Sequence, residues 1–226
     1  MCGRYGLTIA QDELALALEI ERISFDWAPR FNIAPTQAAP ILRVQGGSRE
    51  LALLRWGLVP FWADDRKIGN RMINARSETV ATKPAFRAAF RSRRCLVPLS
   101  GFYEWARRPD GKYPFWIHPA EGSVITVAGL WESWSKGDSG DPLLTFTILT
   151  TRSNELINPL HDRMPVVISA EDRSRWLDPE AKPEALDGLF EPRPGVEFDL
   201  YEVSRLVNSP ANDTPECLTA ASGPEE

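Results

Sequence analysis

The chain has 226 residues, of which 43% are hydrophobic, so it can fill a real core in one domain or two small ones. Its net charge of −5 argues at first against a nucleic-acid partner. No stretch approaches the roughly 20 apolar residues of a membrane span. The N-terminus has no basic-then-apolar leader, which predicts a cytoplasmic protein. Three cysteines without a CxxC pair and only two histidines argue against a disulfide framework and against a metal centre, and no cofactor is expected.

The first predicted element is a helix over residues 11–20, where apolar residues recur at helical spacing. Residues 41–44 and 51–56 flank the turn sequence Gln-Gly-Gly-Ser at 45–48 and predict a hairpin. A second helix is predicted over residues 84–91, because proline is favoured in the first turn of a helix.

The second half of the chain is dominated by predicted strands. Ser169 and an acidic residue three positions later form a capping pattern that opens a short helix ending near residue 177. We expect one strand-rich α+β domain over residues 1–210 with a few short helices, and a flexible tail over residues 211–226. The strands are predicted at 95–99, 114–118, 124–130, 145–151 and 197–203.

Charge is unevenly distributed along the chain. Residues 66–94 contain nine basic residues and one acid, a net charge of +8, so the remaining residues together carry −13. Such asymmetry indicates one basic face on an acidic body. Arg87, Arg91 and Arg94 lie at helical spacing and predict a basic stripe, which fits either a nucleic-acid contact or a solvated helix face.

Cys2 is the residue with the most distinctive chemistry, because removal of Met1 would make it the amino terminus. It would then carry an amine and a thiol on neighbouring carbons, and an α-amine with an ordinary pKa of about 7.7–8.0 is partly neutral at physiological pH. Such an aminothiol condenses with an aldehyde: the amine forms a Schiff base, and the thiol closes a five-membered thiazolidine ring on the same carbon.

Several segments combine aromatic, charged and amide residues at high density, and they occur in a specific order. Together they resemble the SRAP family, the SOS response-associated peptidases or abasic-site processing proteins, and the resemblance extends over most of the chain. The motifs that carry it are Met-Cys-Gly-Arg at 1–4, Asn-Ala-Arg-Ser-Glu-Thr at 74–79, Gly-Phe-Tyr-Glu-Trp at 101–105 and His-Asp-Arg-Met-Pro at 161–165, with further dense segments at 30–35 and 55–62.

The resemblance implies a fold of barrel-like antiparallel sheets and a specific chemistry. The family removes its own Met1 and joins the N-terminal cysteine to the aldehyde of an abasic site in single-stranded DNA as a thiazolidine crosslink. By resemblance Cys2 is the nucleophile, Asn74 holds the amine or a sugar oxygen, and Glu104 is the general acid and base, also for reversal by a lyase-type step. His161 would assist opening of the sugar and steady the adduct.

The resemblance also implies DNA contacts. Arg4, Arg76 and Arg163 would bind phosphates and Trp62 would stack on or wedge beside bases, on single strands and at their junctions with duplex. The chain departs from some family members at 63–67, where alanine replaces a second aromatic and four charged residues follow. We expect a monomer.

Other classes of function remain open from the sequence alone. Class II glutamine amidotransferases also begin with Met-Cys-Gly, although their Arg-Gly-Pro-Asp and Asn-Gly-Glu segments are absent here. A cysteine peptidase could use Cys2 and His161 with Glu104 or Asp162 as its triad. A non-catalytic single-strand binder would keep its affinity without Cys2, whereas a crosslinking protein would lose its covalent product.

Overall fold

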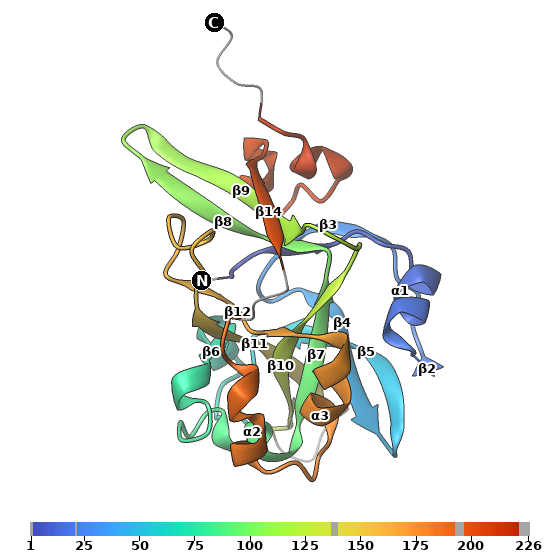
Figure 1. Ribbon diagram of the computed structural model, residues 1–226. Helices are drawn as coiled ribbons and strands as arrows, with labels where there is room; N and C mark the ends of the chain where they lie inside the picture. The colour runs from blue at the N-terminus through green and yellow to red at the C-terminus, as the bar shows by residue number, and fades with distance from the viewer. Residues whose placement is uncertain (1, 21, 137–139, 193–196, 222–226) are drawn as a thin grey trace, which may run out of the picture.

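The computed structural model describes residues 2–20, 22–136, 140–192 and 197–221 (Figure 1). Its larger sheet closes on itself, because β11 pairs antiparallel with β10 and also pairs parallel with β5, through Thr145 opposite Arg55. The result is a five-stranded barrel filled by the main apolar core, which confirms the predicted barrel-like, strand-rich domain. Its strands are β4 (Ala38–Gln45), β5 (Ser48–Trp56), β7 (Arg94–Leu99), β10 (Ile125–Trp134) and β11 (Leu143–Arg152).

Short strands and helices decorate the barrel. The strands β2 (Arg22–Ile23) and β12 (Arg163–Pro165) lie at its margins, while β6 pairs with β11 and β13 with β10. The bounds of the remaining elements here are β6 (Asn74–Arg76), β13 (Val167–Ile168), α2 (Arg87–Ser92) and α3 (Arg173–Leu177). The 3-10 turns are η1 (Arg66–Arg71), η2 (Ser77–Thr79), η3 (Ala170–Asp172) and η4 (Pro183–Leu189).

A second, five-stranded sheet lies above the barrel in Figure 1, with the order β14-β9-β8-β1-β3. Its long hairpin of β8 and β9 projects from the body, and the helix α1 (Gln11–Leu18) lies at the opposite side of the molecule. The bounds of its strands are β1 (Tyr5–Leu7), β3 (Arg30–Ile33), β8 (Gly101–Arg108), β9 (Gly111–Pro119) and β14 (Phe198–Glu202).

Most predicted elements are present, with shifted ends. The hairpin at 41–56 is β4 and β5, and the strands predicted in the second half correspond to β7, β9, β10, β11 and β14. The helix predicted to start at residue 84 begins instead at Arg87, because residues 84–86 form a turn closed by the N–H groups of Phe86 and Arg87 on the carbonyl of Lys83. The strand β8 was not predicted.

The C-terminal segment is packed as far as the structure describes it. A flexible tail was predicted over residues 211–226, of which 222–226 lie outside the described residues. Residues 211–221 pack on the second sheet and contain the 3-10 turn η6 (Pro215–Leu218), and the turn η5 (Arg205–Asn208) comes just before them. Cys217 is fully buried in a small cluster with Tyr103 and Trp116. The carboxylate of Asp213 accepts hydrogen bonds from the backbone N–H groups of residues 31 and 32, so the folded body continues past residue 210.

The predicted arginine stripe is also corrected, because Arg94 does not share an exposed face with Arg87 and Arg91. Its side chain is buried and donates to the carbonyl oxygens of Phe90 at 2.6 Å and Trp176 at 2.8 Å, with Asp178 as a further acceptor. Arg94 therefore ties α2 and α3 to the start of β7, while Arg87 and Arg91 remain exposed.

We expect Arg94→Gln to lower the free energy of unfolding by about 2–4 kcal/mol, because several buried carbonyls lose their donor together. The matched variant Arg91→Gln should change it by no more than about 0.5 kcal/mol, since that side chain is exposed. Urea unfolding of both variants checks this, and equal effects would contradict the structural role of Arg94.

Candidate active site

The start of the chain is fixed beside Glu104 by pairing of β1 with β8. Tyr5 lies opposite Phe102 and Gly6 opposite Gly101, and the N–H of Tyr103 donates to the carbonyl of Arg4 at 2.9 Å. Continued by two residues, this antiparallel register sets position 3 opposite Glu104. Cys2 is the residue just before position 3 and is fully buried, so the predicted nucleophile and the predicted acid lie next to each other.

Asn74 reaches Cys2 from the barrel. It opens β6, which is held in place by parallel pairing with β11, where Asn74 lies opposite Ile148. Its Nδ2 donates to the carbonyl oxygen of Cys2 at 2.8 Å. The Oδ1 of Asn74 is buried and accepts no hydrogen bond in the described structure, so one acceptor beside Cys2 is open to a new donor.

A cleft of about 430 Å³ opens beside these groups and combines residues of the second sheet with residues of the loop before β12. Three of the predicted site residues line it. Its wall is stiffened by the indole N–H of Trp105, which donates to Asn208 Oδ1 at 2.7 Å. The lining residues are Arg4, Glu104, Trp105, Arg107, Lys112, Leu160, His161 and Asn208.

Glu104 has the electrostatic properties of a proton donor and acceptor. It is only 4% exposed, and burial raises the pKa of its carboxyl above the ordinary value, with a further contribution from the negative charge of Asp162. A carboxyl with a raised pKa keeps its proton closer to neutral pH, which suits general acid and base work.

The thiol of Cys2 is not set up as a thiolate. Burial raises its pKa above the ordinary value, and the negative charge of Glu104 raises it further. A buried thiol that holds its proton is a poor first nucleophile, since the thiolate is the reactive form. The sulfur of Cys2 would therefore need a nearby base to take its proton before it could attack.

His161 lies at the edge of the cleft, in the loop before β12. Its Nδ1 is 2.9 Å from the backbone N–H of Arg163 and 2.9 Å from the carboxylate of Asp162, two contacts that require opposite protonation states of Nδ1. Burial lowers the pKa of His161, which favours the neutral ring that accepts from Arg163. The neutral tautomer then carries its proton on Nε2.

Arg163 is held inside the protein in this structure. It is 8% exposed, and its two terminal nitrogens contact the two carboxylate oxygens of Glu78 at 2.5 and 2.9 Å. The Nη2 of Arg163 also donates to the carbonyl of Thr150 at 2.5 Å. Hydrogen bonding to Arg163 lowers the pKa of Glu78. The predicted phosphate contact by Arg163 therefore requires this pair to open, and the pair meanwhile anchors the segment that carries His161.

Arg4 combines a structural and a cleft-facing role. Its Nη1 donates to Asn32 Oδ1 at 2.6 Å and to the carbonyl of Val207 at 2.8 Å, and its guanidinium lies 6.0 Å from the ring centre of Trp105. These contacts fix its position at the cleft wall, where its charge is available to an anion.

Arg76 and Trp62 lie outside the cleft lining and are exposed. Arg76 is two residues after Asn74 on β6, so the alternation of a strand places both on one face. Trp62 is 48% exposed, and its neighbour Phe61 is 56% exposed. The Nε1–H of Trp62 donates to the carbonyl of Pro84 at 3.5 Å.

Sequence reasoning missed part of the cleft wall, namely Trp105 as a lining residue, Arg107, Lys112, Leu160 and Asn208. The turn residues Pro-Asp-Gly at 109–111 were a usable signal, because they predict the hairpin that carries two of these basic residues.

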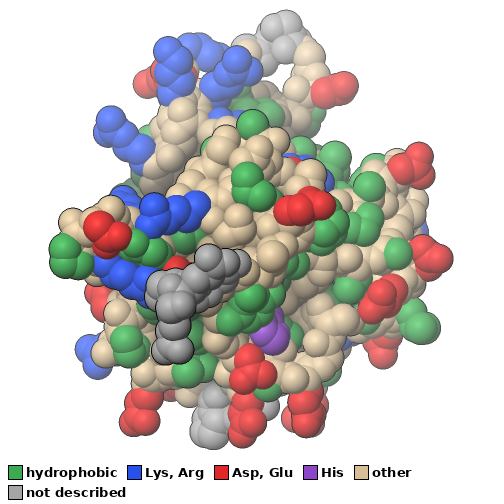
Figure 2. Space-filling model, turned by 90° about the horizontal axis from the view of Figure 1, so that it is seen from above, with side chains coloured by type: hydrophobic (Ala, Val, Ile, Leu, Met, Phe, Trp, Pro, Cys, Tyr) green, Lys and Arg blue, Asp and Glu red, His purple; other side chains and the backbone are tan. Residues whose placement is uncertain are grey.

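Figure 2 shows Lys and Arg side chains gathered on the left and upper left of one face, and most Asp and Glu side chains toward the right and lower edge. Charge is thus segregated in space as well as along the chain.

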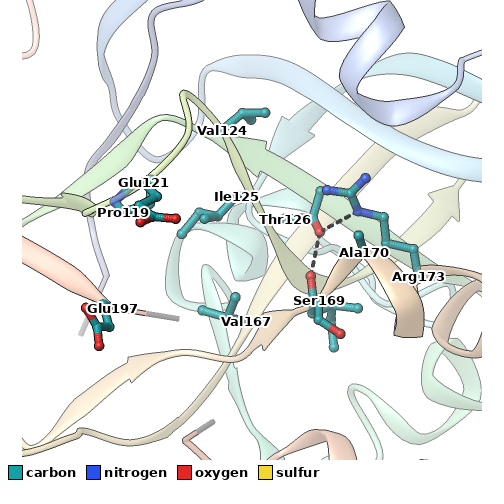
Figure 3. Close-up of a pocket in the computed structure, with 11 residues that line it drawn as sticks. Pro119, Glu121, Val124, Ile125, Thr126, Val167, Ser169, Ala170, Arg173 and Glu197 are labelled. Carbon is teal, nitrogen blue, oxygen red and sulfur yellow. Dashed lines mark hydrogen bonds between the residues drawn. The ribbon is translucent and has the colours of Figure 1, made fainter. Parts of the chain in front are cut away.

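Another hollow, of about 500 Å³, is lined by apolar and polar residues, several of them from β10, β13 and the following turn (Figure 3). Its central polar groups are already paired: Thr126 Oγ1 donates to the carbonyl of Ile168 at 2.8 Å and lies 3.3 Å from Nε of Arg173. None of the predicted site residues lines it.

In the part of the chain that the structure describes, no group of three or more His, Cys, Asp or Glu residues is placed to hold a metal ion, and no helix is long and apolar enough to cross a membrane.

Comparisons with known proteins agree with the fold and the motifs. The family model of the SOS response associated peptidases (SRAP) matches residues 1–210. The abasic site processing protein YoqW of Bacillus subtilis is 41% identical over 222 residues, which are 96% of this chain and 99% of that protein. The abasic site processing protein HMCES of Xenopus tropicalis is 31% identical over 263 aligned positions, with 97% of this chain and 78% of that protein covered. A crystal structure of a Bacteroides thetaiotaomicron protein superposes with a TM-score of 0.88 over 98% of this chain and 100% of its own, at 24% identity, and shows the same fold.

The buried carboxyl of Glu104 makes stability depend on pH. Because its pKa is raised in the folded state, the folded protein binds the proton more tightly than the unfolded chain, and stability is lost as pH rises from the unfolded value through the folded one. We expect Glu104→Gln to raise the melting temperature at pH 7 and the gain to shrink toward pH 4. The exposed control Glu155→Gln should show no such trend in calorimetry, and a pH-independent effect of Glu104→Gln would contradict the burial argument.

Proposed function

The chain belongs to the SOS response associated peptidase (SRAP) family, and from that membership we propose that it processes abasic sites by forming a covalent crosslink with single-stranded DNA. The crosslink is a thiazolidine between Cys2 and the aldehyde of the opened sugar. The observation that carries the proposal is the position of Cys2, held by Asn74 at 2.8 Å, next to the strand position opposite Glu104 and beside a cleft with Arg4 and His161.

The chemistry begins with removal of Met1 by hydrolysis of its peptide bond, which frees the amine of Cys2. The amine attacks the aldehyde carbon, a C–N bond forms, and the aldehyde oxygen leaves as water to give an imine. The thiol sulfur then adds to the same carbon, and its proton passes to nitrogen. Overall, one aldehyde and one aminothiol yield one thiazolidine and one water.

Glu104 is proposed to move the protons in these steps. Loss of water requires a proton on the departing hydroxyl, and a buried carboxyl with a raised pKa keeps its proton to a higher pH than an exposed one. The same group in its ionised form accepts the proton that the thiol of Cys2 gives up during ring closure. A thiol with a raised pKa needs such an acceptor nearby, since little thiolate is present beforehand.

Asn74 and His161 are proposed to position the reacting groups. The open Oδ1 of Asn74 can accept a hydrogen bond from the amine of Cys2, which orients the nitrogen lone pair and satisfies a buried acceptor. His161, neutral and protonated on Nε2, can donate to the ring oxygen of the closed sugar and favour its opening to the aldehyde.

The proposed DNA path uses the exposed groups around the cleft. Arg4 and Arg76 would contact phosphates, Arg163 would join them when its pair with Glu78 opens, and Trp62 would stack on a base, a contact worth about 1–3 kcal/mol. Binding of this kind reads backbone and base faces and not sequence. We propose a monomer that shields the lesion in the DNA damage response, with release by a lyase-type reversal through Glu104.

The experiment that tests the function is intact-protein mass spectrometry before and after mixing with an oligonucleotide that carries one abasic site. We expect the free protein to lack Met1 and the mixture to contain a species at the mass of protein plus oligonucleotide minus one water. Loss of Met1 without an adduct would contradict the crosslinking function and would direct assays toward amide substrates.

We expect Cys2→Ser to lose the heat-stable adduct, because an oxazolidine is far less stable than a thiazolidine. The serine variant still has a terminal amine, so borohydride should trap its imine with the abasic site. Denaturing gels with and without borohydride check both results. A heat-stable adduct of the serine variant in the absence of borohydride would rule out ring closure by sulfur.

We expect Glu104→Gln to slow both formation and reversal of the adduct by about 10²–10⁴-fold, the range typical of a general acid and base. Reversal can be measured by transfer of the protein from one oligonucleotide to an excess of a longer one. Glu155→Gln serves as the matched control and should leave both rates unchanged. Normal rates in Glu104→Gln would remove Glu104 from proton transfer.

A further inference from the structure

The projecting hairpin of β8 and β9 carries two basic side chains directly opposite each other. Arg107 on β8 pairs with Lys112 on β9, both are exposed, and both line the cleft that holds Glu104 and His161. Side chains at directly opposed positions have Cβ atoms about 4.5–5.5 Å apart, so two cations are held within reach of one anion.

This placement is unfavourable for the isolated protein. Like charges at directly opposed strand positions destabilise a sheet. Neither Arg107 nor Lys112 forms an ion pair or a side-chain hydrogen bond with any residue that the structure describes. The pair therefore lacks the compensation that a purely structural cation usually has.

Other cations at the same hairpin are compensated, which makes the contrast informative. Arg108 contacts Glu202 at 2.6 Å and lies 4.0 Å from the ring centre of Tyr113. Arg205 covers the same ring at 4.2 Å. Among these four cations, only Arg107 and Lys112 lack an ion pair or an aromatic contact with a described residue. The uncompensated positive charge of the hairpin therefore lies on the cleft side.

The charge of Arg107 also acts on the reactive groups. Burial is the main cause that lowers the pKa of His161, and the positive charge of Arg107 is a smaller one, after that of Arg163. Along β8, Arg107 is three residues beyond Glu104, a distance of about 10 Å at 3.3 Å per residue. A backbone phosphate next to a sugar at Glu104 would thus lie within reach of a long arginine or lysine side chain.

We propose that Arg107 and Lys112 form a phosphate-binding subsite, the hairpin subsite, which holds the DNA backbone on one side of the abasic sugar. The arginine offers a planar fork of donors and the lysine a mobile point charge, a combination suited to a phosphodiester. This inference rests on the proposed function. It adds a contact on the second sheet, whereas Arg76 lies on β6, which pairs with the barrel strand β11, and Trp62 lies in the loop after β5.

The test measures non-covalent binding to a single strand with a tetrahydrofuran abasic analogue, which has no aldehyde and cannot crosslink. We expect Lys112→Gln to reduce the slope of log affinity against log salt by about 0.7, and Arg107→Gln/Lys112→Gln by about 1.4. The matched control is Lys182→Gln, an exposed lysine outside the cleft, which should keep the wild-type slope. Equal slopes for Lys112→Gln and Lys182→Gln would overturn the hairpin subsite.

A second measurement locates the subsite and separates it from the proposed function. Oligonucleotides with the analogue at the 5′ or the 3′ end supply phosphates on one side only, and the double variant should weaken binding of just one of them. Equal weakening of both would overturn the placement on one side. The wild-type protein should form the adduct with a genuine abasic site; absence of that adduct would refute the crosslinking function and leave the salt measurement readable.

Discussion

The pairing of β1 with β8 is the constraint on which the site depends, because it brings the start of the chain to Glu104. Two glycines make the pairing possible. A Cβ atom on Gly101 would lie 2.4 Å from the ring of Trp116 and 2.6 Å from the carbonyl of Ile117, and one on Gly6 would lie 3.0 Å from the same ring. The bare backbones let Trp116 pack across both strands, and the register that results places Cys2 beyond the end of β1, where chemistry is possible.

The site is built where two sheets meet, and it concentrates groups that reduce stability. The second sheet supplies Cys2 and Glu104, and the barrel side supplies Asn74 and His161. A buried carboxyl, a buried thiol and an unsatisfied amide oxygen each carry a desolvation cost, which the large apolar core of the barrel offsets. Groups that reduce stability are expected at functional sites, and here the carboxyl, the thiol and the amide oxygen all lie at or beside Cys2.

Arginine serves two separate purposes in this protein. Arg94 and Arg163 are buried and use their planar donors to join carbonyls or a carboxylate from distant segments. Arg76 and Arg107 are exposed, and their charge faces solvent. The positive balance of residues 66–94 therefore overstates the basic surface of that segment, whereas the hairpin subsite adds charge at a place that the charge count did not indicate.

Much of the fold could be predicted from the sequence, since apolar periodicity, turn residues and motif order are local properties. They predicted the first hairpin and most barrel strands, and the order of the motifs carried the family resemblance from which Cys2, Asn74, Glu104 and His161 are proposed as the catalytic set. Only the tertiary structure decided that residues 211–221 are packed, that Arg94 and Arg163 are internal, and that Arg107 faces Lys112 in the cleft. These facts depend on contacts between segments far apart in sequence, such as 85 residues for Arg163 and Glu78, and burial and charge pairing are set by such contacts and not by neighbouring residues.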